Sequence, residues 1–146
     1  MKTALLIIDV QKAAKPSAAL VRGVEEAQYC YDAVFVSKFV NKGSPLLPLT
    51  EWGGYDDEDF AFSPRPDAVV FEKGTYTSFT EALKDFDEVH LCGCDTDACV
   101  YKTALDLIEN GVRPVVLSGL CASENDAYHQ AGLSLLRRNI GAANVK

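Results

Sequence analysis

Short apolar runs of strand length recur along the chain. They occupy residues 3–8, 33–36, 68–71, 89–92 and 115–117 and are rich in Val, Ile and Leu. A strand with one face in water alternates apolar and polar residues, whereas these runs are apolar at nearly every position. The pattern therefore predicts strands buried on both faces, as in a parallel sheet covered by helices.

Stretches of helical periodicity separate these runs. Residues 17–29 form one, a second ends at Asn110-Gly111, and Ser123-Glu-Asn-Asp126 fits a capping box that opens a third. The inner faces that we expect are Leu20, Val24 and Ala27; then Val100, Ala104, Leu107 and Ile108; and then Ala127, Ala131 and Leu135. Strands alternating with amphipathic helices predict a single doubly wound, Rossmann-like α/β domain over residues 1–146, in three layers.

Residues 41–66 do not fit this alternation. The segment holds four of the six prolines, the only tryptophan (Trp52), Gly53-Gly54 and an acidic cluster at 56–59. A connection of this length inside a small domain is typical of an active-site lid or an interface arm. A surface insertion without a function is the alternative.

Composition narrows the function classes. The formal net charge of −7 argues against binding to nucleic acid or to an anionic membrane, so we expect a small-molecule partner. No apolar run approaches the roughly 20 residues that span a bilayer, and Met1-Lys2 leads into a strand pattern rather than a signal peptide. We therefore expect a cytoplasmic protein whose five cysteines are free thiols.

Three polar residues stand where ligands bind in such folds, beyond the carboxyl ends of the strands. Asp9 follows the first apolar run, Lys73 follows the third, and Cys99 lies past the fourth, in the first turn of a helix. A thiol there feels the positive end of the helix dipole, which favours thiolate, and a carboxylate can take its proton. Taken singly, Asp9 can be a turn residue and Lys73 a solvated lysine; the prediction rests on the three together.

Three segments resemble one enzyme family. Asp9 in "LLIIDVQ", Lys73 in "FEKGTYTSF" and Cys99 in "CGCDTDACV" are similar to the signature segments of the isochorismatase-like cysteine hydrolases, which include nicotinamidases and N-carbamoylsarcosine amidase. The resemblance implies a mainly parallel sheet of six strands and a triad of Asp9, Lys73 and Cys99. It also implies a cis peptide bond between Cys94 and Asp95, and an oxyanion hole made by the backbone N–H groups of Asp95 and Cys99.

The implied activity is hydrolysis of a C–N bond, of amide or carbamoyl type, through a thioester on Cys99. Asp9 would act as general base and then acid, and Lys73 would keep it ionised and oriented. Pocket residues expected from the resemblance and the long loop are Phe39, Asn41, Trp52 and Tyr76, although aromatic residues are equally common in cores.

The chain also departs from the family pattern. Nicotinamidases carry a metal site with histidines after the second strand, and "VSKFVNKGSPLLPLTEW" contains none, so we expect neither metal nor cofactor. Asp95 stands where many members have a small apolar residue. The family resemblance makes a homo-oligomer the expected assembly.

Two alternative functions, a metal protein and a ligand-binding protein without catalysis, remain open. His90, Cys92 and Cys94 alternate onto one strand face and, with Cys99 and Cys121, suggest a zinc site, although the usual C-x-x-C spacing is missing. The other is a catalytically weak or silent member of the fold that binds a ligand or a partner.

Overall fold

The computed structural model describes all residues, 1–146, and contains one sheet of five parallel strands. The order across the sheet is β3-β2-β1-β4-β5. The strands are β1 (Thr3–Ile8), β2 (Ala33–Phe39), β3 (Val69–Lys73), β4 (Glu88–Cys94) and β5 (Arg113–Ala122). This architecture confirms the predicted α/β fold with a parallel sheet.

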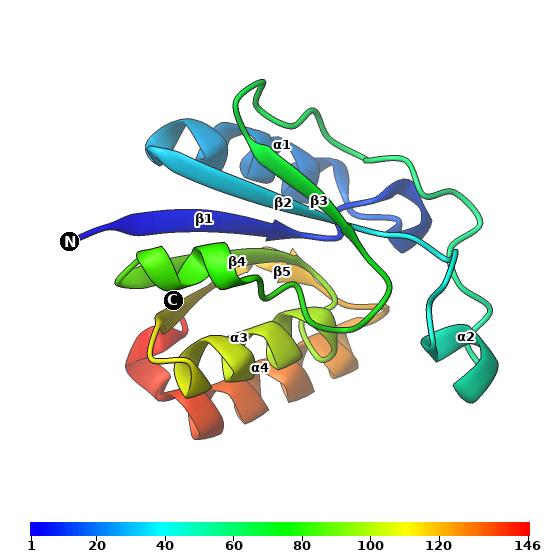
Figure 1. The fold of residues 1–146 in the computed structure, drawn as a ribbon. Helices are drawn as coiled ribbons and strands as arrows, with labels where there is room; N and C mark the ends of the chain where they lie inside the picture. The colour runs from blue at the N-terminus through cyan, green and yellow to red at the C-terminus, as the bar shows by residue number, and fades with distance from the viewer.

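Helices cover both faces of the sheet (Figure 1). The α-helices are α1 (Ala18–Ala27), α2 (Leu46–Leu49), α3 (Cys99–Glu109) and α4 (Asp126–Ile140). Short 3-10 helices occupy Lys12–Ala14, Gln28–Cys30, Glu81–Asp85 and Ala142–Asn144. One face lies under α1 and the other under α3 and α4, which gives the three layers. None of the helices has the length and apolar character that crossing a bilayer requires.

The expectation of six strands is wrong. A sixth strand would lie next to β5. At that edge the chain forms only one isolated bridge, between Val116 and Val145, and the Ser118 N–H donates to the Lys146 carbonyl at 2.6 Å. Because the 3-10 turn at Ala142–Asn144 uses the residues that follow α4, only Val145 and Lys146 run beside β5. Two residues are too few for a strand.

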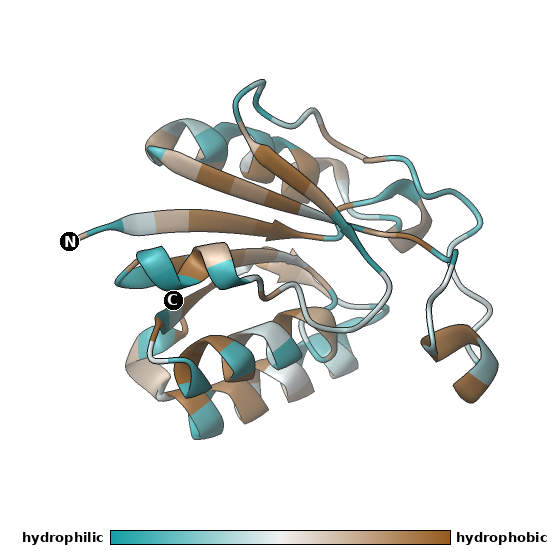
Figure 2. Cartoon of the chain, in the orientation of Figure 1, coloured by the Kyte–Doolittle hydropathy of each residue, from teal (hydrophilic) through white to brown (hydrophobic).

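The core consists of two clusters, one on each side of the sheet. Along β1, Leu6 and Ile8 face α3 and α4, while Leu5 and Ile7 face α1, and all four are fully buried. Figure 2 shows largely apolar strands between helices that carry both apolar and polar residues. The continuous apolar run of β1 therefore marks a strand that is buried on both faces, as predicted. The run at 68–71 does not: it belongs to the edge strand β3, where Val69 and Val70 are about half exposed.

The inner face of α4 differs from the expectation. Its N-cap is Asn125 rather than Ser123, and Leu135 is 46% exposed. The buried positions are instead Gly132, Leu133, Leu136 and Ile140. A Cβ on Gly132 would lie 2.8 Å from the backbone nitrogen of Asp97, so the helix packs through its glycine against the loop that precedes α3.

The long connection between β2 and β3 contains only the short α2, which projects beyond the carboxyl end of β2 (Figure 1). Gln11 anchors it. The fully buried Gln11 side chain donates to the carbonyls of Phe39 and Glu58, at 2.8 and 2.9 Å, and accepts the Phe39 N–H at 2.8 Å. Gln11, just after β1, thus fixes the position of the loop relative to the end of β2.

The strand order reverses between β1 and β4, and the two strands approach closely at Gly93. Its φ is +117°, and a Cβ there would lie 2.0 Å from the Ile8 carbonyl oxygen.

We expect Gly93→Ala to lower the free energy of unfolding by about 3 kcal/mol or more, because the clash is with backbone. Urea unfolding measures this.

Gly119→Ala in β5 is the matched control, since nothing lies within 4 Å of the added Cβ. It should change the free energy of unfolding by less than about 1 kcal/mol. Equal losses in the two variants would contradict the close approach of β1 and β4.

Candidate active site

Asp9, Lys73 and Cys99 meet at the carboxyl edge of the sheet. Lys73 Nζ lies 2.6 Å from Asp9 Oδ2 and donates to Cys99 Sγ at 3.3 Å. Asp9 follows β1, Lys73 ends β3, and Cys99 begins α3. The structure therefore brings together the three residues that the sequence pattern selected, around one ammonium group.

The backbone at Asp9 turns sharply as it leaves β1. Its φ is +50°, in the left-handed region that non-glycine residues rarely adopt. The side chain is fully buried, and Oδ1 accepts a hydrogen bond from Ser37 Oγ at 3.0 Å. Such a conformation persists only where the surroundings hold it, and here the ion pair and the serine both do.

A chain of buried hydroxyl groups continues from Asp9 to α3. Ser78 Oγ donates to Ser37 Oγ at 2.8 Å, and the Ser78 N–H donates to Thr103 Oγ1 at 2.8 Å. Thr103 Oγ1 in turn donates to the Cys99 carbonyl at 2.7 Å. The three hydroxyl residues are at most 1% exposed, so this chain fixes the first turn of α3 relative to Asp9.

Sequence reasoning missed these three hydroxyl residues. The available signal was a polar residue on an otherwise apolar face: Ser37 between Phe35 and Phe39 in β2, and Thr103 beside the buried Val100, Ala104 and Leu107 of α3. Buried polar groups need hydrogen-bond partners, so each such residue indicates a second polar residue nearby.

Lys73 is held from several sides. Its ammonium group donates to the carbonyls of Thr75 and Tyr76, at 2.8 and 3.1 Å, and lies 5.5 Å from the centre of the Phe39 ring. The side chain is 8% exposed. An ammonium group with this many partners has a fixed position rather than a mobile one.

Burial dominates the protonation of the site. Burial raises the pKa of the Asp9 carboxyl, although Lys73 opposes this rise, so Asp9 is a stronger base than a surface aspartate. Burial and the negative charge of Asp9 raise the pKa of the Cys99 thiol to about 12, again against Lys73. The helix-dipole expectation of a resting thiolate is thus outweighed, and the site holds a thiol beside a proton acceptor.

Three backbone N–H groups between the end of β4 and the start of α3 have no acceptor inside the protein: those of Asp95, Asp97 and Cys99. Asp95 and Cys99 are the two that the resemblance assigns to an oxyanion hole. The peptide bond between Cys94 and Asp95 is cis, the geometry that the resemblance implied. Free N–H groups beside a nucleophile are what an oxyanion needs, although the Asp95 carboxyl lines the same cavity.

A cavity of about 680 Å³ opens onto Cys99. Phe39, Trp52 and Tyr76 line it as expected, together with Tyr55, which sequence reasoning missed. Asn41 does not line it: its side chain donates to the Tyr55 carbonyl at 2.6 Å and accepts the Tyr55 N–H at 2.9 Å. Asn41 therefore supports the wall from behind.

The suggested zinc site is not formed. His90 contacts the Tyr31 hydroxyl and the Glu88 carboxylate, both at 2.6 Å, and no three His, Cys, Asp or Glu side chains are grouped as ligands. The connection from β2 to β3 contains no histidine, and the Glu58 carboxylate there accepts the Asn41 N–H at 2.9 Å. These residues do not fit the metal site of nicotinamidases.

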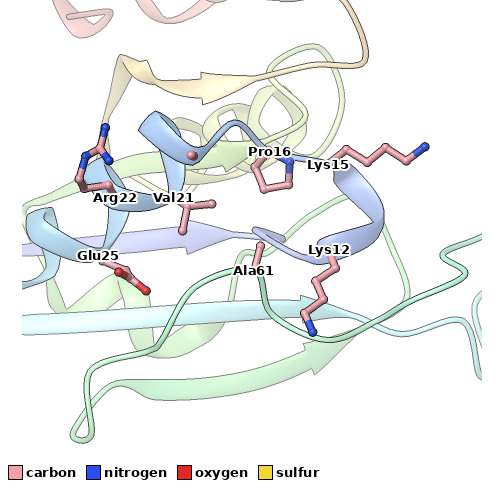
Figure 3. Close-up of a pocket in the computed structure, with 8 residues that line it drawn as sticks. Lys12, Lys15, Pro16, Val21, Arg22, Glu25 and Ala61 are labelled. Carbon is pink, nitrogen blue, oxygen red and sulfur yellow. The ribbon is translucent and has the colours of Figure 1, made fainter.

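A second hollow, of about 620 Å³, lies beside α1 (Figure 3). Lys12, Lys15 and Arg22 border it, but their side chains point in different directions. Lys12 is also 3.9 Å from Asp59. The three cations do not converge, so this hollow does not form an anion site.

Comparison with known proteins places these features in a family. A model of the isochorismatase domain matches residues 3–144. Isochorismatase domain-containing protein 2 from Xenopus laevis is 30% identical over 86 residues, 52% of this chain and 42% of that protein. Uncharacterized isochorismatase family protein PncA from Bacillus subtilis is 34% identical over 84 residues, 53% of this chain and 46% of that protein. Each match spans less than half of the relative's length.

Solved structures share the fold along nearly the whole chain. An isochorismatase-like hydrolase from Alkaliphilus metalliredigens has a TM-score of 0.83 at 20% identity, over 99% of this chain and 94% of that one. Nicotinamidase PncA from Bacillus subtilis has a TM-score of 0.77 at 23% identity, over 99% of both chains. Sequence identities this low show a shared fold and nothing further.

The ion pair gives a test by stability. Lys73→Met leaves the Asp9 carboxylate buried without its counter-charge, so we expect a loss of about 3–5 kcal/mol at pH 8. In the variant the pKa of folded Asp9 rises further above its unfolded value, so the folded state binds more protons than the unfolded state. Stability then increases as pH falls, and the deficit relative to wild type should shrink towards pH 4.

Urea unfolding at pH 8 and pH 4.5 measures both values. Lys84→Met is the control, because its pair with Glu81 lies at the surface, and it should cost less than about 1 kcal/mol at either pH. A Lys73→Met deficit that does not change with pH would contradict the ionised Asp9–Lys73 pair.

Proposed function

Because this chain belongs to the isochorismatase family, we propose that it is a cysteine hydrolase that cleaves a C–N bond of a small amide or carbamoyl compound. The observation that carries the proposal is the position of the Lys73 ammonium, 2.6 Å from Asp9 and 3.3 Å from Cys99 at the edge of a cavity. A thiol, a proton acceptor and a fixed cation are the parts that nucleophilic catalysis needs.

In the proposed first step, Asp9 takes the proton of the Cys99 thiol as sulfur attacks the substrate carbonyl. The raised pKa of the Asp9 carboxyl suits this transfer, because it makes the buried carboxylate a better acceptor and so offsets part of the cost that the raised pKa of the Cys99 thiol adds. The N–H groups of Asp95 and Cys99 stabilise the oxyanion that forms.

In the second step Asp9 returns the proton to the leaving nitrogen, and the C–N bond breaks to leave a thioester on Cys99. Water then adds to the thioester with Asp9 as base, and sulfur leaves and recovers its proton. The sum is amide plus water giving carboxylic acid plus amine. Lys73 and Ser37 act throughout by holding the Asp9 carboxylate in place.

The choice of bond rests on the thiol. Cleavage of a vinyl ether, as in isochorismatases, needs no nucleophilic cysteine, whereas amide hydrolysis through a thioester does. Several structures that share the fold are those of nicotinamidases, which supports amide chemistry as the class. The residues after β2 do not fit a metal site, so no step is assigned to one.

A second candidate is a silent member of the fold that binds a ligand. Two observations favour it: the thiol pKa of about 12, and a carboxyl side chain on Asp95, next to the N–H groups that would hold an oxyanion. Both make the attacking thiolate and the oxyanion costlier to form. Turnover decides between the two candidates.

The test is release of ammonia or amine from a panel of primary amides and carbamoyl compounds that includes nicotinamide. Addition of hydroxylamine should divert the thioester to a hydroxamate, which mass spectrometry detects. Cys99→Ala should lose at least about a thousandfold in turnover, and Asp9→Asn a comparable factor, because each removes a group that acts in every step.

Cys30→Ala is the matched control, since Cys30 is an exposed thiol away from the cavity. It should keep full activity. Turnover that survives in Cys99→Ala would overturn the proposal, and a wild-type protein that binds panel members without hydrolysing any would favour the silent ligand-binding protein.

A further inference from the structure

The cavity beside Cys99 carries unpaired negative charge. Asp56, Asp95 and Glu124 all line it, and none of their carboxylates has an ion pair or accepts a hydrogen bond from another group of the protein. A carboxylate at a protein surface is ordinarily free in water, but three that face one cavity add their fields inside it.

Positive charge at the cavity does not balance these carboxylates. The Lys73 ammonium is matched by Asp9 at 2.6 Å. Lys15 is the one lysine on the lining, and it is an exposed side chain that also borders the second hollow. The cavity therefore has an excess of negative charge.

Of these three residues, Asp95 is the one whose backbone N–H is assigned to the oxyanion. Its pKa is raised to about 6, first by burial and then by the negative charges of Asp97, Asp9 and Glu124. At neutral pH it is still mostly ionised, in a place where its neighbours repel it. A positive ligand would lower the energy of this arrangement, and a negative ligand would raise it.

Aromatic rings form part of the same wall. The centre of the Phe39 ring lies 5.0 Å from that of Trp52 and 5.5 Å from that of Tyr55, and the Trp52 and Tyr55 centres are 5.4 Å apart. Ring faces attract cations, and alkylammonium groups most of all, because these groups are weakly hydrated. Ser123, also on the lining, has a hydroxyl without a partner in the protein.

We infer that this cavity selects ligands that carry positive charge, an alkylammonium group in particular. Resting on the proposed function, the substrate is then a cationic amide whose charged end lies among Asp56, Asp95 and Glu124 while its carbonyl faces Cys99. The charge preference itself does not depend on turnover, so the two statements can be tested apart.

The test uses three thiol reagents of similar size: methanethiosulfonates that bear a trimethylammonioethyl, a neutral 3,3-dimethylbutyl or a sulfonatoethyl group. Each transfers its group to sulfur as a mixed disulfide and releases methanesulfinate. Rates at Cys99 and at the exposed Cys30 are read by mass spectrometry at pH 7.5, and Cys30 serves as internal reference. Relative to Cys30, the cationic reagent should modify Cys99 at least about tenfold faster than the anionic one.

Variants assign the preference to particular side chains. Asp95→Asn and Glu124→Gln should each reduce the ratio of cationic to anionic rates by about threefold or more. Glu109→Gln is the control, because it removes the same charge from an exposed position at the opposite end of α3 from Cys99. It should leave the ratio unchanged.

Three outcomes would overturn the inference: equal rates for cationic and anionic reagents in the wild type, a ratio that Asp95→Asn and Glu124→Gln leave unchanged, or a Cys99 that none of the three reagents reaches.

Hydrolysis is measured on a separate matched set: 4-(trimethylammonio)butanamide, its neutral tert-butyl isostere and the anionic glutaramate. We expect the cationic amide to be hydrolysed fastest. Turnover without charge preference would remove the inference and keep the proposed function. Charge-selective labelling without turnover of any amide would keep the ligand charge and remove the hydrolase.

Discussion

Asp9 and Lys73 lie 2.6 Å apart where water has almost no access, and the rest of the site is arranged around this ion pair. A buried carboxylate is unfavourable unless charge and hydrogen bonds compensate it. Lys73 supplies the charge, and Ser37 supplies a hydrogen bond. Cys99 takes the remaining place beside the ammonium group, so the requirement to satisfy Asp9 also fixes the position of the thiol.

The fold delivers these groups by close backbone approaches at the carboxyl edge of the sheet. Gly93 lets β4 run against the end of β1, and Gly132 lets α4 press against the loop that leads into α3. Gln11 ties Glu58 of the long connection to Phe39 at the end of β2, which brings the aromatic residues of that connection over the cavity. Contacts made by β4, by α4 and by Gln11 thus together fix the backbone around the site.

Much of this could be predicted from the sequence, because strong local signals carry it. Apolar runs that are not amphipathic indicated a parallel sheet, and in such a sheet Asp9, Lys73 and Cys99 had to lie at one edge. What could not be predicted depends on side-chain packing. Burial raised the pKa of Cys99 against the helix dipole, and α4 turned its glycine rather than Leu135 inward. Asn41 became a support for Tyr55 rather than a wall of the cavity.

The central claim is that the proton of Cys99 passes to Asp9 and not to solvent, and the pH dependence of Cys99 alkylation by iodoacetamide tests it most directly. In the wild type, the pair shares one proton over a wide pH range, so the rate should stay level from pH 6 to 9. In Asp9→Asn the thiol must lose its proton to water. Burial still raises the pKa of the thiol and Lys73 still lowers it, so the rate should rise with pH, by about tenfold per unit below that pKa. The same steep rise in both proteins would contradict the account, because it would mean that Cys99 ionises without Asp9.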